Sequence, residues 1–64
     1  MAISIKAARV NAGYTQEEVA KELGKSKNTI VSWEAYITAP DIIMAKAMAT
    51  LFNMSVDDII WSKE

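Results

Sequence analysis

The side chains that most enzymes use for catalysis are missing from this chain. Its 64 residues include no histidine and no cysteine. This excludes the usual general base, the usual thiolate nucleophile and most zinc ligands. Asp, Glu, Ser, Thr, Tyr and Lys remain, and their spacing forms no catalytic constellation. We therefore expect no enzymatic activity, no metal site and no cofactor.

Two pairs of adjacent acids resemble metal ligands. Glu17-Glu18 follows Thr15 closely, and Asp57-Asp58 follows Ser55. Both pairs fall in the first turn of a predicted helix, where the helix dipole stabilises negative charge. Adjacent acids in that position are far more often dipole complements than ligands, and we interpret both pairs in that way.

A third group of side chains is suited to reading DNA bases. If Ile30 and Trp33 face the core from a helix over 27–35, four residues face outward: Lys27, Asn28, Val31 and Ser32. Lysine donates to guanine O6 and N7, asparagine pairs with adenine through two hydrogen bonds, and a valine methyl packs on the thymine methyl. A polar helix surface without any partner would have nearly the same composition, so both interpretations stay open from these residues alone.

Helix signals dominate the elements that would position this face. No stretch alternates as a strand does, and no Asn-Gly or Asp-Gly turn occurs. Thr15 and Glu18 form a capping box, Ser26 caps the next helix, and Gly13 and Gly24 stand where helices end. We predict helices over about 4–12, 16–23, 27–35, 42–52 and 56–61. The fold class is therefore all-α, a single five-helix domain over residues 1–64.

The predicted core follows from helical spacing. A domain of this length buries only about 60% of its unfolded surface, so its core is small. The apolar positions that share the inner faces are Ile5, Ala8, Ala12, Val19, Ala20, Leu23, Ile30, Trp33, Ile42, Ala45, Met48, Ala49 and Phe52. We expect Ala20 to be small because the second and third helices cross there.

Charge and hydropathy limit the surroundings of the chain. The net charge is −1, which gives no general attraction to nucleic acid. Five of the seven basic residues nevertheless precede position 28. No apolar stretch approaches the roughly 20 residues of a membrane span, and residues 1–6 do not form a signal peptide. We therefore expect a soluble cytoplasmic protein without a membrane partner.

The second and third helices, joined by residues 23–26, form a helix-turn-helix. Residues 13–24, with Ser26, Thr29-Ile30, Trp33-Glu34 and Pro40, resemble the phage repressor/Cro (XRE-type) DNA-binding family. The resemblance runs from about residue 5 to residue 59, including the late segment 52–59. Its specificity comes from Thr-Gln, Ala, Gly, Ile and Glu recurring together at the positions of the family.

The resemblance implies a function and roles for several residues. The helix over 27–35 would be the recognition helix in the major groove of double-stranded DNA. The protein would bind the DNA as a dimer. Gln16, at the start of the second helix, would touch the DNA backbone and brace the recognition helix. Arg9 and Glu34 would form a partly buried ion pair that holds the recognition helix to the first helix. Apart from the resemblance, Lys21 and Lys25 are well placed for phosphate.

Two departures from the family point to a different partner. In the loop over 35–40, Ala35 and Ile37 cannot donate from their side chains to phosphate, which predicts weakened DNA binding. The helix over 42–52 is apolar nearly all round, with a second stripe of Ile43, Met44, Ala47 and Leu51. We predict an interface, natural or engineered, for a second copy or another protein, formed by Ala35, Tyr36, Ile37, Ala39, Ile43, Met44 and Ala47.

Two functions follow from these observations. The first is a sequence-specific DNA-binding domain of a repressor-type transcriptional regulator. The second is a protein-interaction module on the same scaffold, with DNA binding weakened or lost. For the second apolar stripe, the alternative is that the fifth helix, with Ile60 and Trp61, folds back and covers it within the monomer.

Overall fold

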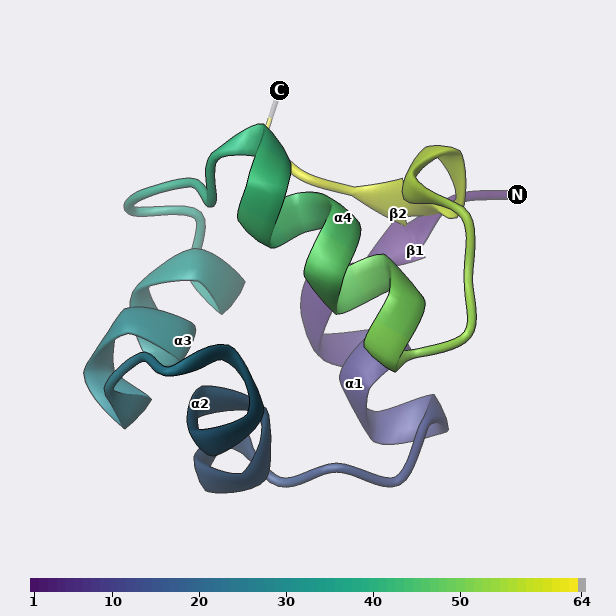
Figure 1. The fold of residues 1–64 in the computed structure, drawn as a ribbon. Coiled ribbons are helices and arrows are strands. Elements are labelled where there is room, and N and C mark those ends of the chain that lie inside the picture. Colours follow the sequence, from purple (N-terminus) through teal and green to yellow (C-terminus); the bar gives the residue numbers. More distant parts are fainter. Residues whose placement is uncertain (64) are drawn as a thin grey trace.

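Four helices and two very short strands make up the fold. The computed structural model describes residues 1–63. The elements in chain order are β1 (Ile3–Ser4), α1 (Ile5–Asn11), α2 (Gln16–Leu23), α3 (Lys27–Glu34), α4 (Ile42–Leu51), the 3-10 turn η1 (Val56–Asp58) and β2 (Ile59–Ile60) (Figure 1). The four predicted helices up to residue 52 are therefore present, with ends that differ by at most one residue.

The predicted fifth helix over 56–61 is wrong. Ser55 caps only a three-residue 3-10 turn, and the chain then extends into β2. This strand pairs in parallel with β1, and Ile3 lies opposite Ile59. Two residues are too few to show the alternation that marks a strand, and the pairing partner lies at the other end of the chain. The fold is therefore mostly helical with four helices and a small strand pair.

Side-chain caps and backbone turns define the helix ends. The side chains that accept a hydrogen bond from the first turn of a helix are those of Ser4, Thr15, Ser26 and Asp41. The predicted capping box of Thr15 and Glu18 is confirmed. Each helix is followed by a residue in the left-handed conformation: Gly13, Gly24, Tyr36 and Asn53. Such residues allow the last carbonyl groups of a helix to be satisfied by the following backbone N–H groups.

Tyr36 is unusual among these left-handed residues. Its φ is 60°, a conformation that is uncommon for a bulky side chain. The Ile5 N–H donates to its hydroxyl oxygen at 3.4 Å, and the hydroxyl donates to the carbonyl of Ile60 at 2.8 Å. The side chain therefore links the end of α3 to the start of α1 and to β2. The sequence predicts Tyr36 as an anchor for a partner, whereas the structure uses its hydroxyl within the monomer.

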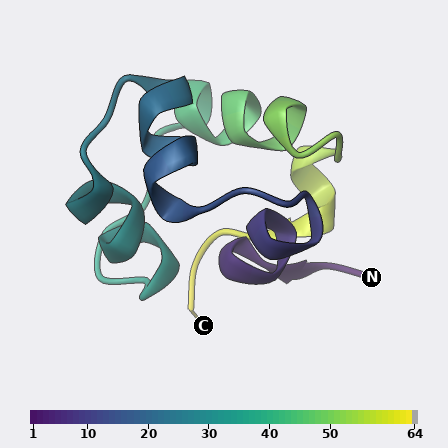
Figure 2. The same ribbon diagram turned by 90° about the horizontal axis from the view of Figure 1, so that it is seen from below.

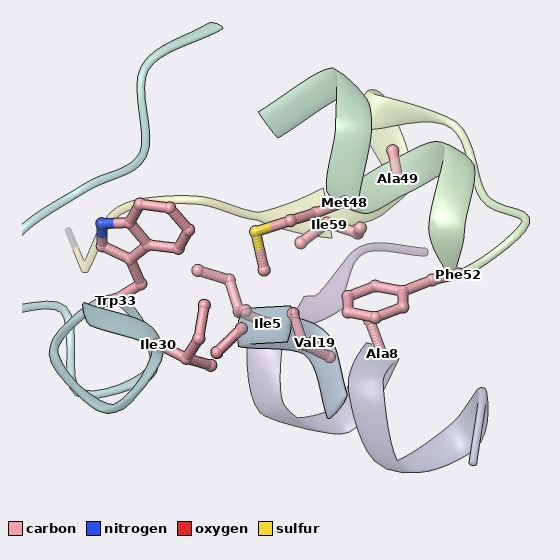
Figure 3. Packing of buried hydrophobic residues seen from close by; sticks show 10 residues of the cluster. Ile5, Ala8, Val19, Ile30, Trp33, Met48, Ala49, Phe52 and Ile59 are labelled. Carbon is pink, nitrogen blue, oxygen red and sulfur yellow. The ribbon is translucent and has the colours of Figure 1, made fainter. Parts of the chain in front are cut away.

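The core lies where all four helices meet. Ile5, Val19, Ile30 and Met48 are fully buried and come from four different helices. Figure 3 shows these side chains together with Trp33 and Phe52 under α4. Two predicted core positions are wrong: Ala12 is exposed because it follows the last turn of α1, and Ile42 is exposed at the first turn of α4. The helices α2 and α3 are in contact, and Ala20 of α2 is only 4% exposed.

An ion pair between Arg9 and Glu34 holds α3 against α1. Arg9 Nε donates to Glu34 Oε2, and Arg9 Nη2 donates to Glu34 Oε1 at 3.3 Å. The two side chains are only 10% and 5% exposed. Arg9 Nη1 also donates to the carbonyl of Tyr14 at 2.8 Å, and Gln16 Nε2 donates to Glu34 Oε1 at 3.0 Å. The pair therefore joins α1, the following turn, α2 and the end of α3.

We predict that Arg9→Ala and Glu34→Ala each destabilise the fold by about 3–5 kcal/mol, because each leaves a nearly buried charge without its partner. The double replacement Arg9→Met with Glu34→Leu should cost less than the sum of the single changes. Urea unfolding followed by circular dichroism measures all three. Single changes below about 0.5 kcal/mol that simply add would contradict a buried, coupled pair.

Candidate nucleic-acid interface

The outer face of α3 presents the four residues predicted to read bases. Ile30 and Trp33 are buried on the inner face. Lys27, Asn28 and Val31 are exposed on the outside, and Ser32 is half-buried. In both Figure 1 and Figure 2, α3 lies at the left edge of the molecule, away from the strand pair. The arrangement offers cationic, amide, hydroxyl and methyl groups on one short, accessible helix.

A hydrogen bond joins this face to the loop that follows it. The hydroxyl groups of Ser32 and Thr38 lie 2.8 Å apart, and either of them is a suitable donor. Thr38 was not among the predicted site residues. Its signal in the sequence is the one aliphatic hydroxyl of the loop over 35–40, six positions after Ser32. The bond places one polar side chain of the loop beside the outer face of α3.

Lys27 forms an ion pair with Glu17 of α2. Lys27 Nζ lies 3.2 Å from Glu17 Oε2, and the two side chains are 52% and 65% exposed. The pKa of Glu17 lies below its ordinary value, first because of a hydrogen bond from its own backbone N–H and then because of Lys27. Glu17 is therefore ionised at neutral pH. The sequence predicts Glu17 only as a complement to the helix dipole, so this contact with α3 is additional.

The predicted phosphate ligands surround the same region. Gln16 is the first residue of α2, and one N–H of its side-chain amide is directed at Glu34. Lys21 lies in the last turn of α2, and Lys25 lies in the turn before α3. Both lysines are exposed, and neither forms an ion pair within residues 1–63. Their ammonium groups are therefore available to an anionic partner.

The predicted protein interface is split in the structure. Ile37 and Ile43 are 78% and 70% exposed, and Ala35 and Ala39 are exposed beside them in the loop. Met44 instead packs on the core, as Leu51 does. Ala47 is half-buried and lines a shallow, open hollow between α2 and α4. The second apolar stripe of α4 is therefore only partly exposed to solvent. The fifth helix that was the alternative explanation for its burial is absent, because residues 59–60 form strand β2.

The part of the chain that the structure describes contains no helix long and apolar enough to cross a membrane. Over residues 1–63, no three acidic side chains gather as a group that could hold a metal ion. Asp58, from one of the two acidic pairs, accepts a hydrogen bond from the N–H of Ser55 at 3.3 Å. It therefore completes a cap, as expected for an acid in a first turn.

Comparisons with known proteins agree with this geometry. A family model described as Helix-turn-helix matches residues 5–59. The uncharacterized HTH-type transcriptional regulator YgzD of Bacillus subtilis is 27% identical over 60 residues, which cover 94% of this chain and 91% of YgzD. The HTH-type transcriptional regulator ImmR of the same organism is 33% identical over 60 residues, covering 94% of this chain and 47% of ImmR.

A further relative comes from an archaeon. An uncharacterized HTH-type transcriptional regulator of Archaeoglobus fulgidus is 37% identical over 59 residues, which cover 92% of this chain and 83% of the relative. No solved structure matches the chain. The family match spans α1 to the start of β2, and the helix pair α2–α3 supplies the turn that gives the family its name. The chain therefore belongs to the helix-turn-helix family of the phage repressor/Cro (XRE) type.

Proposed function

We propose that this chain is the sequence-specific DNA-binding domain of a transcriptional regulator, with α3 as its recognition helix in the major groove. The observation that carries the proposal is that α3 exposes Lys27, Asn28 and Val31, while the pair of Arg9 and Glu34 joins its end to α1. The names of the relatives, all HTH-type transcriptional regulators, support the same function. A helix held so firmly loses little freedom when it enters a groove.

Each of the four outward residues of α3 would have a partner on a base edge. Asn28 would pair with adenine N6 and N7, and Lys27 would donate to guanine O6 or N7. Val31, which is 40% exposed, would pack on a thymine methyl. Ser32 would donate to an acceptor on either base pair once its hydrogen bond to Thr38 rearranges. These contacts would select sequence.

Other groups would hold the DNA backbone. The first N–H groups of α2 and the side chain of Gln16 would face a phosphate, because a helix start attracts anions. Lys21 and Lys25 would neutralise further phosphates without reading sequence. Ala35 and Ile37 add no side-chain donors in the loop, so we expect modest affinity and a shallow dependence on salt.

We predict that Asn28→Ala weakens binding to the preferred duplex by about 1–3 kcal/mol and relaxes the choice at one base pair. Lys25→Ala should weaken all duplexes alike and reduce the salt slope by about one. Selection from random duplexes near 50 mM salt, followed by binding titrations, measures both. If the native chain enriches no sequence under these conditions, the proposed function is wrong.

We further propose that two copies bind together across half-sites about one helical turn apart. A symmetric dimer uses the same patch on both subunits. The exposed isoleucines of the loop and of the start of α4, namely Ile37, Ile42 and Ile43, supply apolar area that the monomer leaves in water. Small Ala35 and Ala39 would allow close approach beside them. The other residues of the predicted interface, Tyr36, Met44 and Ala47, would contribute through their remaining exposed atoms.

We predict that Ile37→Lys with Ile43→Lys abolishes self-association, because both charges would be buried at the contact. Sedimentation equilibrium at rising concentration measures the mass, with and without DNA. Val10→Lys controls for placing a lysine on the surface, since Val10 is a 55% exposed apolar residue of α1 outside this patch. A native chain that stays monomeric at every concentration, free and on DNA, would show that this patch is not a dimer interface.

A further inference from the structure

We propose that Glu17 is a specificity-determining residue: with Lys27 it reads one G·C base pair, Lys27 binding the guanine and Glu17 the cytosine. The inference rests on the proposed function, because it requires α3 to lie in the major groove. It assigns a role in base recognition to a residue of α2, outside the recognition helix.

The geometry brings the two charged groups to one point. Lys27 is the first residue of α3, and the N-terminal residues of a recognition helix are those that contact base edges. Its Nζ lies 3.2 Å from Glu17 Oε2. In this arrangement the carboxylate lies beside the ammonium group that would enter the groove. Both side chains are more than half exposed, so neither is committed to the core.

The paired groups match the major-groove edge of one kind of base pair. A G·C pair presents two acceptors on guanine, N7 and O6, followed by the N4 amino donor of cytosine. The ammonium of Lys27 has three donors and one of them serves Glu17, which leaves two for guanine. The ionised carboxylate of Glu17 only accepts, and it has free acceptor sites for the cytosine amino group. An A·T pair places its donor between two acceptors, an order that fits two neighbouring charges less well.

The same contact argues against a role of Lys27 in phosphate binding. A phosphate near Lys27 would also lie near the Glu17 carboxylate, and the two anions repel each other. Lys25, which forms no ion pair within residues 1–63, is free of this restriction. Glu17 would therefore direct Lys27 towards a base edge and away from the DNA backbone.

The test compares Glu17→Ala with Glu22→Ala on the duplex selected by the native chain and on its single-base variants. Glu22 is also an exposed acid of α2, so the change in net charge is the same. We expect Glu17→Ala to reduce the preference for G·C at one position about tenfold, the scale of a lost base contact. Lys27→Ala should reduce the preference at that same position. Glu22→Ala should leave the preference at every position unchanged. Thermal unfolding should show that both Glu variants are folded at the temperature of the binding assay.

Two results would overturn the inference alone. One is a Glu17→Ala variant that keeps the native preference at every position while the native chain binds a defined sequence. The other is a loss of preference at different base pairs in Glu17→Ala and Lys27→Ala. A native chain that selects no sequence at all would overturn the proposed function as well, so the two failures are distinguishable.

Discussion

The ion pair of Arg9 and Glu34 is the interaction on which the presentation of α3 depends. Both side chains are nearly buried, and burying a charge is favourable only when its remaining donors and acceptors are also satisfied. Arg9 meets this condition through the carbonyl of Tyr14, and Glu34 meets it through Gln16. Within residues 1–63, no buried side-chain nitrogen or oxygen lacks a hydrogen-bond partner. The geometry of these contacts fixes the end of α3 relative to α1 and α2.

Tyr36 holds the same end of α3 from the other side. A bulky residue in the left-handed conformation costs about 1–2 kcal/mol. Its hydroxyl offsets this cost by satisfying the first N–H of α1 and a carbonyl of β2. The short strand pair is therefore connected to the recognition helix through one side chain. These hydrogen bonds explain how the loop over 35–40 has a defined conformation although a tyrosine, and not a glycine, occupies the left-handed position 36.

The surface separates into two regions with different chemistry. The outer face of α3 is polar, and lysines flank its first turn. In the loop and at the start of α4, isoleucine side chains are mostly exposed within residues 1–63. DNA binding would use the first region and self-association the second, so one small domain has room for both. The protein-interaction function predicted as an alternative would use only the second region.

Local signals explain which parts of the fold could be predicted. Thr15 with Glu18, Ser26 and Gly24 mark helix ends through bonds within a few residues, and the structure contains each of these ends. The pairing of β1 with β2 joins the two ends of the chain, and two residues carry no pattern of their own. The hydroxyl bonds of Tyr36 are equally distant in sequence.

The candidate site also has features that could be predicted from the sequence and features that could not. Spacing around Ile30 and Trp33 is enough to predict which residues of α3 face outward. The contacts that Lys27 makes with Glu17 and Ser32 makes with Thr38 depend on how neighbouring elements pack, and helical periodicity does not describe that. Ile42 shows the same limit, since the spacing fits the inner face but the helix start turns it to solvent.

Amide chemical-shift mapping of the labelled chain during titration with its selected duplex tests most directly whether α3 binds DNA in the position that it has in the free protein. We predict the largest changes at Gln16, Lys27, Asn28, Val31 and Ser32. We also predict that the Arg9 side-chain Nε–H signal keeps its position, because the pair with Glu34 already exists in the free protein. Changes confined to the loop over 35–39 and to α4, with α3 unaffected, would show that α3 is not the recognition helix.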